Sequence, residues 1–145
     1  MIALLQRANW GRLTINGQQQ CKIGRGLVVF VGIERDDDEN KADRLLHRLL
    51  AYRVFADVDG KMNLSLLDIG GDLLLVSQFT LAATTDKGLR PGFSTAMPPA
   101  EAEPLYDYMV RQAATHKIAL ATGAFGADMK VALENDGPVT FLLRA

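Results

Sequence analysis

The amino-acid sequence predicts an α/β fold, in which a single domain has a predominantly β core of mixed or barrel-like sheets and two amphipathic helices. Three observations support this prediction. Apolar, β-branched runs recur along the chain, two segments carry apolar residues at helical spacing, and no segment repeats another. The length of 145 residues suffices for one sizeable core and is too short for two ordinary domains, so residues 1–145 are expected to form one domain.

The first third of the chain predicts strands joined by tight turns. Residues 2–9 are expected to form a strand, and Asn16-Gly17 predicts a hairpin turn between two short strands. Residues 26–33, GLVVFVGI, form a continuous apolar run, which is typical of a strand that is buried on both faces.

A helix is predicted from about Lys41 to Arg53, after a charged loop in which Asp38 or Asn40 is a suitable cap. One face of this helix carries its apolar residues, which are Ala42, Leu45, Leu46, Leu49 and Leu50. A second amphipathic helix is predicted from about Ala100 to His116.

The remaining segments predict further strands and one long loop. Residues 72–81, DLLLVSQFTL, are expected to form a second buried strand. The next segment, AATTDKGLRPGFSTAMPP, has no periodicity, and loops of this length are usually functional. Three short strands are predicted around residues 118–122, 128–134 and 139–143.

The C-terminal sequence ENDGPVTFLLRA predicts a hairpin whose turn is Asn135-Asp136-Gly137. Pro138 follows the glycine at once, although proline cannot donate a hydrogen bond to a strand ladder. A rigid Gly-Pro pair at this tip therefore needs a reason other than strand pairing.

Composition and charge narrow the function classes. Hydrophobic residues make up 48% and charged residues 23%, as in globular proteins, and the net charge of −1 indicates no global attraction to nucleic acid. The one cysteine, Cys21, permits no intrachain disulfide, which suits a reducing cytosol. The N-terminal sequence shows neither a signal peptide nor a membrane span, so we expect a cytoplasmic protein with no membrane partner.

Several kinds of active site are absent from the sequence. No cysteines or histidines stand at metal-ligand spacing, and no dinucleotide or phosphate-loop motif occurs, so we expect no metal and no cofactor. His47 lies off the apolar stripe of its helix, and His116 is expected in the last helical turn, so neither is favoured as a catalytic base. A serine or threonine nucleophile would need such a base.

Two segments allow both a structural and a functional interpretation. The polar residues Ser77, Gln78 and Thr80 could mark a strand leaving the core, or a site built at its carboxyl end beside the long loop. Phe125 and Met129 could be packed residues of a glycine-hinged connection, or the wall of a pocket.

Stretches along the whole chain together resemble the D-aminoacyl-tRNA deacylases, also described as D-tyrosyl-tRNA(Tyr) deacylases. They are GRGLVVFVGI at 24–33, KADRLLHRLLAYRVFADVDGKMNLSL at 41–66, SQFTL at 77–81, GLRPGFS at 88–94, FGADM at 125–129 and NDGPVT at 135–140. The chain departs from the usual pattern at NWGR (9–12), Leu89, Gly92 and Ala124, where contacts with RNA would differ.

The resemblance implies an editing hydrolase that cleaves the ester of D-aminoacyl-tRNA, and of glycyl-tRNA(Ala), to free amino acid and tRNA. It implies a homodimer with its site at the subunit interface. Catalysis would be RNA-assisted, because the terminal 2′-hydroxyl would help to activate water. The backbone N–H groups of Phe79 and Thr80 would then stabilise the oxyanion. Ser77 and Gln78 would orient the adenosine or the ester, and Phe125 and Met129 would form pocket walls.

The same resemblance gives Gly137 and Pro138 a role. Their peptide bond would be cis, and the pair would reach into the partner's pocket and reject L-amino acids. Arg7 could hold this tip in place, or it could be an ordinary arginine on a strand surface.

Two other functions remain open. The first is a threonine-nucleophile esterase for small molecules, with Thr80 attacking, which would need a base nearby. The second is a non-catalytic, dimeric RNA-binding module, which predicts a basic stripe with interleaved aromatic residues. The sequence shows instead scattered cations that could meet phosphate: Arg7, Arg12, Lys22, Arg25, Lys87 and Arg90.

Overall fold

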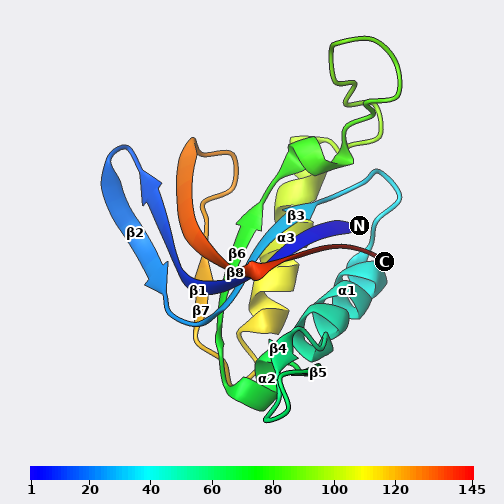
Figure 1. Ribbon diagram of the computed structural model, residues 1–145. Helices are drawn as coiled ribbons and strands as arrows, with labels where there is room; N and C mark the ends of the chain where they lie inside the picture. The colour runs from blue at the N-terminus through cyan, green and yellow to red at the C-terminus, as the bar shows by residue number, and fades with distance from the viewer.

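The computed structural model describes every residue from Met1 to Ala145 and is organised around one mixed sheet (Figure 1). Its strands are β1 (Ile2–Ile15), β2 (Gln18–Ile23), β3 (Gly26–Gly32), β6 (Asp72–Ser77), β7 (Leu120–Thr122) and β8 (Met129–Arg144). β1 pairs along its length with antiparallel β8, and on its other edge it pairs first with β3 and then with β2. β3, β6 and β7 are mutually parallel. β2 lies against β6 and β7, so the sheet curls into a nearly closed barrel.

Two helices, α1 (Glu39–Ala51) and α3 (Pro99–Ala113), pack side by side on the sheet (Figure 1). The apolar stripe predicted for the first helix is confirmed, because its five residues are the buried residues of α1. Asp38 is the N-cap, and its carboxylate accepts a hydrogen bond from Lys41 N–H at 2.8 Å. None of the helices combines the length and the apolar composition that crossing a bilayer would require.

The core has two parts, which explains the continuous apolar runs of β3 and β6. The larger cluster lies between the helices and the sheet and includes Leu27, Val29 and Leu75. The smaller cluster lies inside the curled sheet and includes Val28 and Leu74. Alternate residues of the same strand therefore enter different clusters, and both faces of the strand are apolar.

The predicted hairpin at Asn135-Asp136-Gly137 is wrong. The predicted strands at 128–134 and 139–143 are parts of one strand, β8, and both pair with β1. Asn135 lies opposite Ala8 and Thr140 lies opposite Gln6, so residues 136–139 form a bulge, which we call the tip. The Asp-Gly signal was misleading because a bulge needs the same permissive backbone as a tight turn.

Other boundaries also differ from the prediction. The strand predicted over 72–81 ends at Ser77, and a 3₁₀ helix, η1 (Phe79–Ala82), follows it. The predicted strand at 2–9 continues to Ile15, whereas the turn at Asn16-Gly17 is confirmed by positive φ angles of 51° and 76°. α3 ends at Ala113, so His116 lies beyond its last turn.

Three short elements were not predicted: β4 (Phe55–Ala56), β5 (Met62–Leu64) and α2 (Leu66–Ile69). Elements of two to four residues are too short to show a periodic pattern. The signal for α2 was its capping box, in which Ser65 and Asp68 each accept from the other's backbone N–H group.

Candidate functional site

A cavity of about 710 Å³ opens at the carboxyl ends of the parallel strands β3 and β6. This is the edge of a parallel sheet at which binding sites are usually built. Of its 20 lining residues, 13 are hydrophobic, so the cavity suits a ligand with an apolar part. The cavity brings together five of the predicted site residues: Ser77, Gln78, Phe79, Phe125 and Met129.

The wall formed by Phe125 is supported by the core. Its ring lies 6.1 Å from the ring of Tyr106 on α3, measured between centroids. The Tyr106 hydroxyl donates a hydrogen bond to Leu75 O at 2.9 Å. Burial raises the pKa of Tyr106 well above its usual value, so this hydroxyl stays protonated and acts as a donor, not as a base.

Two backbone donors stand at the start of η1, at the edge of the cavity. The first hydrogen bond of this helix runs from Leu81 N–H to Gln78 O at 3.2 Å, so the N–H groups of Phe79 and Thr80 precede it. No side chain caps this end of the helix. Phe79 lines the cavity and Thr80 does not.

The Thr80 hydroxyl is engaged as an acceptor. The Gln78 side-chain amide donates to Thr80 Oγ1 at 2.6 Å, and no carboxylate or imidazole bonds to this hydroxyl. Neither His47 nor His116 lines the cavity. Cys21 is not an activated nucleophile either, because burial raises the pKa of its thiol.

The sequence did not identify the charged residues at the cavity, which are Arg35 and Asp128. Both Asp128 oxygens accept hydrogen bonds from Lys130 Nζ, at 2.8 and 2.9 Å, and the Asp128 side chain is 83% exposed. Arg35 Nε donates to Ser94 O. The position of Arg35 shortly after a buried strand was the available signal for it. No group of three potential metal ligands occurs in the molecule.

The tip projects from β8 with Gly137 and Pro138 exposed, and their peptide bond is cis. Asn135 shapes the tip, because its side-chain oxygen accepts from Val139 N–H at 2.8 Å and its amide donates to Thr140 Oγ1 at 2.8 Å. Neither Gly137 nor Pro138 lines the cavity of its own chain.

Arg7 connects the tip to the rest of the sheet. Its Nε donates to Asp136 O at 3.1 Å and pairs with the Asp136 carboxylate at 3.0 Å, while Nη1 donates to Val54 O at 2.6 Å. The Arg7 side chain is only 13% exposed. Of the two interpretations left open for Arg7, these contacts favour the one in which it holds the tip.

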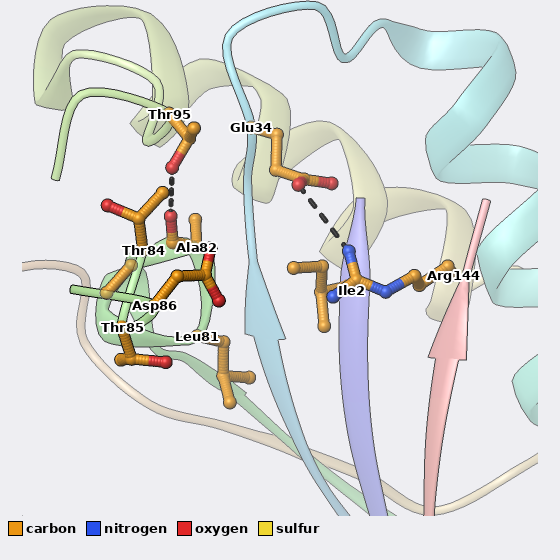
Figure 2. Close-up of a pocket in the computed structure, with 10 residues that line it drawn as sticks. Ile2, Glu34, Leu81, Ala82, Thr84, Thr85, Asp86, Thr95 and Arg144 are labelled. Carbon is orange, nitrogen blue, oxygen red and sulfur yellow. Dashed lines mark hydrogen bonds and ion pairs between the residues drawn. The ribbon is translucent and has the colours of Figure 1, made fainter. Parts of the chain in front are cut away.

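A second, smaller cavity of about 280 Å³ lies beside the start of β1 (Figure 2). Arg144 and Glu34, which both line this cavity, form an ion pair of 3.7 Å, and the Thr95 hydroxyl donates to Ala82 O. None of the predicted site residues lines it, so the larger cavity is the candidate active site.

The scattered cations form no stripe. Arg12 and Lys22 are cross-strand neighbours on β1 and β2, and Arg25 lies over the Phe55 ring, 5.6 Å from its centroid. Lys87 and Arg90 lie in the exposed loop between η1 and α3.

Comparisons of the sequence with known families and proteins agree on one family. The family described as D-Tyr-tRNA(Tyr) deacylase matches residues 4–144. Proteins named D-aminoacyl-tRNA deacylase are 58% identical in Aeromonas hydrophila, over 99% of each chain, and 57% identical in Stutzerimonas stutzeri, over the full length of both. A solved structure titled c-Myc DNA Unwinding Element Binding Protein superposes with a TM-score of 0.95 and 37% identity, over 100% of this chain and 99% of that one. The chain therefore belongs to the D-Tyr-tRNA(Tyr) deacylase family.

Proposed function

We propose that this protein is a D-aminoacyl-tRNA deacylase, an ester hydrolase that acts on aminoacyl-tRNA in the cytoplasm with residues 1–145 as one catalytic domain. One observation carries the proposal for this site. Two backbone N–H donors stand beside a mostly apolar cavity that contains no histidine and no activated nucleophile. Such a site suits an ester that is already reactive and requires positioning more than a strong protein base.

In the proposed reaction, water attacks the carbonyl carbon of the ester that joins the amino acid to the terminal ribose. The oxyanion that forms accepts hydrogen bonds from the N–H groups of Phe79 and Thr80, which are fixed by η1 and need no reorganisation. The bond from the carbonyl carbon to the ribose oxygen then breaks, which yields the free amino acid and the 3′-hydroxyl of tRNA. The neighbouring 2′-hydroxyl of the ribose relays the proton of the attacking water to the departing 3′-oxygen, which leaves as a hydroxyl.

Some cavity residues are proposed to orient the substrate, and others form the walls of the cavity. Ser77 and Gln78 present polar side chains at the end of β6, where they would orient the adenosine or the ester. Phe125 and Met129 form walls on the side of α3 and β8, against which the amino-acid side chain would pack.

The tip is proposed to complete the site of a second copy in a homodimer. Gly137 and Pro138 are exposed and stand outside the cavity of their own chain, while Arg7 and Asn135 fix their position. A fixed wall on the side to which an L side chain points would exclude every L-amino acid by steric conflict. D side chains would point away from it, and glycine would be accepted because it has no side chain, which gives activity on glycyl-tRNA(Ala).

The experiment that tests the function compares D-tyrosyl-tRNA, L-tyrosyl-tRNA and the ethyl ester of D-tyrosine. We expect D-tyrosyl-tRNA to be hydrolysed. For each of the other two substrates, kcat/KM should be lower by at least about 10²-fold, which corresponds to a loss of about 2.7 kcal/mol of transition-state stabilisation. Light scattering should report twice the chain mass of 15.8 kDa. Equal hydrolysis of both enantiomers, or full selectivity in a monomer, would contradict the proposal.

Thr80→Ala separates this mechanism from the rival threonine-nucleophile esterase. We expect the variant to retain its rate within about tenfold, because the substitution preserves the backbone N–H and removes only a hydroxyl that accepts from Gln78. The kcat of Thr80→Ala and of the control Thr84→Ala should be measured on D-tyrosyl-tRNA. Complete loss of turnover in Thr80→Ala alone would favour the esterase.

A further inference from the structure

The segment 85–91, which we call the arm, extends away from the body of the molecule above η1 (Figure 1). Its base is closed by Thr84 and Gly92, which exchange backbone hydrogen bonds of 2.8 and 2.9 Å. Every residue of the arm is exposed. The arm is thus a defined projection on a fixed base.

Both ends of the arm are connected to the candidate active site. One end follows η1, whose first residue is Phe79, and the other continues into Phe93. Both aromatic residues line the large cavity, and their ring centroids are 5.1 Å apart. The Thr95 hydroxyl, which donates to Ala82 O, ties the two ends together below the base (Figure 2). The arm therefore rises from the mouth of the cavity.

The arm carries charge that the fold does not use. Lys87 and Arg90 form no ion pair and no side-chain hydrogen bond within the chain, and Asp86 is the only acidic residue beside them. The side chain of Leu89 is fully exposed, whereas Thr85 and Asp86, near the base of the arm, line the smaller cavity. Two free cations on a projecting segment fit a polyanionic partner better than a role in stability.

We propose that the arm binds the phosphate backbone at the acceptor end of the substrate tRNA. This inference rests on the proposed function, because an ester held in the cavity fixes the place at which the RNA strand leaves it. The outermost residues of a seven-residue loop lie at most about 12 Å from its base, because half of the loop spans each side. A stacked single strand advances about as far per nucleotide as one strand of a duplex, about 3.4 Å, so Lys87 and Arg90 can meet phosphates about three nucleotides from the cavity mouth. Such contacts position the RNA without reading its sequence.

The test uses the variant Lys87→Gln/Arg90→Gln and two substrates, D-tyrosyl-tRNA and 3′-O-(D-tyrosyl)adenosine. For the tRNA we expect KM to rise by roughly tenfold, with kcat within about twofold, because two phosphate contacts are lost. The negative slope of log(kcat/KM) plotted against log[salt] should decrease in magnitude by about 1.4, which is about 0.7 for each of the two contacts to a single strand. The adenosine ester is too short to reach the arm, so its kinetics should not change.

The charge-retaining variant Lys87→Arg/Arg90→Lys should restore the KM for tRNA. The matched control Arg53→Gln/Lys61→Gln removes two exposed cations beside β4 and β5, at the end of the molecule opposite the arm, and should leave both substrates unaffected (Figure 1). An arm variant that changes neither substrate, or both equally, would overturn the inference. So would a change in molecular mass, because the arm would then be a contact between copies of the chain.

The affinity for an acceptor-stem hairpin RNA that carries no amino acid should also be measured. This measurement keeps the inference about the arm separate from the proposed function. If the unmodified protein hydrolyses neither substrate, the deacylase proposal fails, and weaker RNA binding by the arm variant would still support the arm. If hydrolysis proceeds but the arm variant binds the hairpin as the unmodified protein does, only the arm proposal fails.

Discussion

Replacing the terminal 2′-hydroxyl of the substrate by hydrogen, with D-tyrosine on the 3′-oxygen, is expected to slow hydrolysis by about 10²–10⁴-fold, the usual contribution of a general acid or base. The cavity offers no side chain to replace this group. Tyr106 stays protonated, Asp128 is held by Lys130 at an exposed rim, and the Thr80 hydroxyl accepts from Gln78. In the proposed mechanism, the 2′-hydroxyl of the substrate therefore assists in removing the proton from the attacking water.

Single-turnover rates at saturating enzyme should be measured for the 2′-hydroxyl and 2′-deoxy substrates, so that weaker binding does not mimic slower chemistry. Asp128→Asn is the matched protein variant, because it removes the one carboxylate that lines the cavity. We expect this variant to retain its rate within about tenfold. Undiminished cleavage of the deoxy substrate, or a loss in Asp128→Asn as large as the deoxy effect, would rule out RNA-assisted catalysis.

Gly26→Ala is expected to destabilise the protein by about 3 kcal/mol or more, because overpacking against backbone cannot be relieved by a rotamer change. A Cβ at Gly26 would lie 1.9 Å from Asp72 O and 2.7 Å from Asp72 C. Gly26 and Asp72 are the first register pair of β3 and β6, so relief would require these parallel strands to separate. The opposite ends of both strands meet the cavity, so activity should fall together with stability.

Gly24→Ala is the matched control, since the nearest atom to its Cβ would be Asp72 Oδ2 at 3.4 Å, an ordinary contact. Thermal unfolding followed by circular dichroism should show a large decrease in Tm for Gly26→Ala and a small one for Gly24→Ala. Equal Tm values for the two variants would show that the start of β3 can shift without cost.

The sequence predicted the parts of the fold that depend on local periodicity. α1 and the doubly buried strands β3 and β6 follow from apolar spacing, which each segment carries by itself. The tip could not be predicted in this way, because a bulge in β8 is defined by its pairing with β1 more than a hundred residues earlier in the chain. Asp-Gly indicates only where the backbone can bend, not whether the partner strand changes.

The candidate site could likewise be predicted only where it depends on residues that are close in the sequence. Ser77, Gln78 and Phe79 lie at the end of a predicted strand, so their place at the sheet edge followed from the sequence. The contact between Arg7 and Asp136 joins residues 129 positions apart, and no spacing rule indicates it. Arg35 follows a predicted buried strand closely, which was a signal for it, but its place at the cavity also depends on its contact with Ser94 in the long loop.

The bulge in β8 has a consequence for how this protein can vary. Residues after the tip pair with Ile2–Gln6, and Leu143 is buried opposite Ala3 whereas its neighbour Leu142 is exposed. An insertion or deletion that moved this pairing by one position would turn Leu143 outward, because side chains alternate between the faces of a strand. Substitutions in the tip leave the pairing intact. A change of length in the tip must thus be absorbed within the tip itself, or the last strand segment loses its packing.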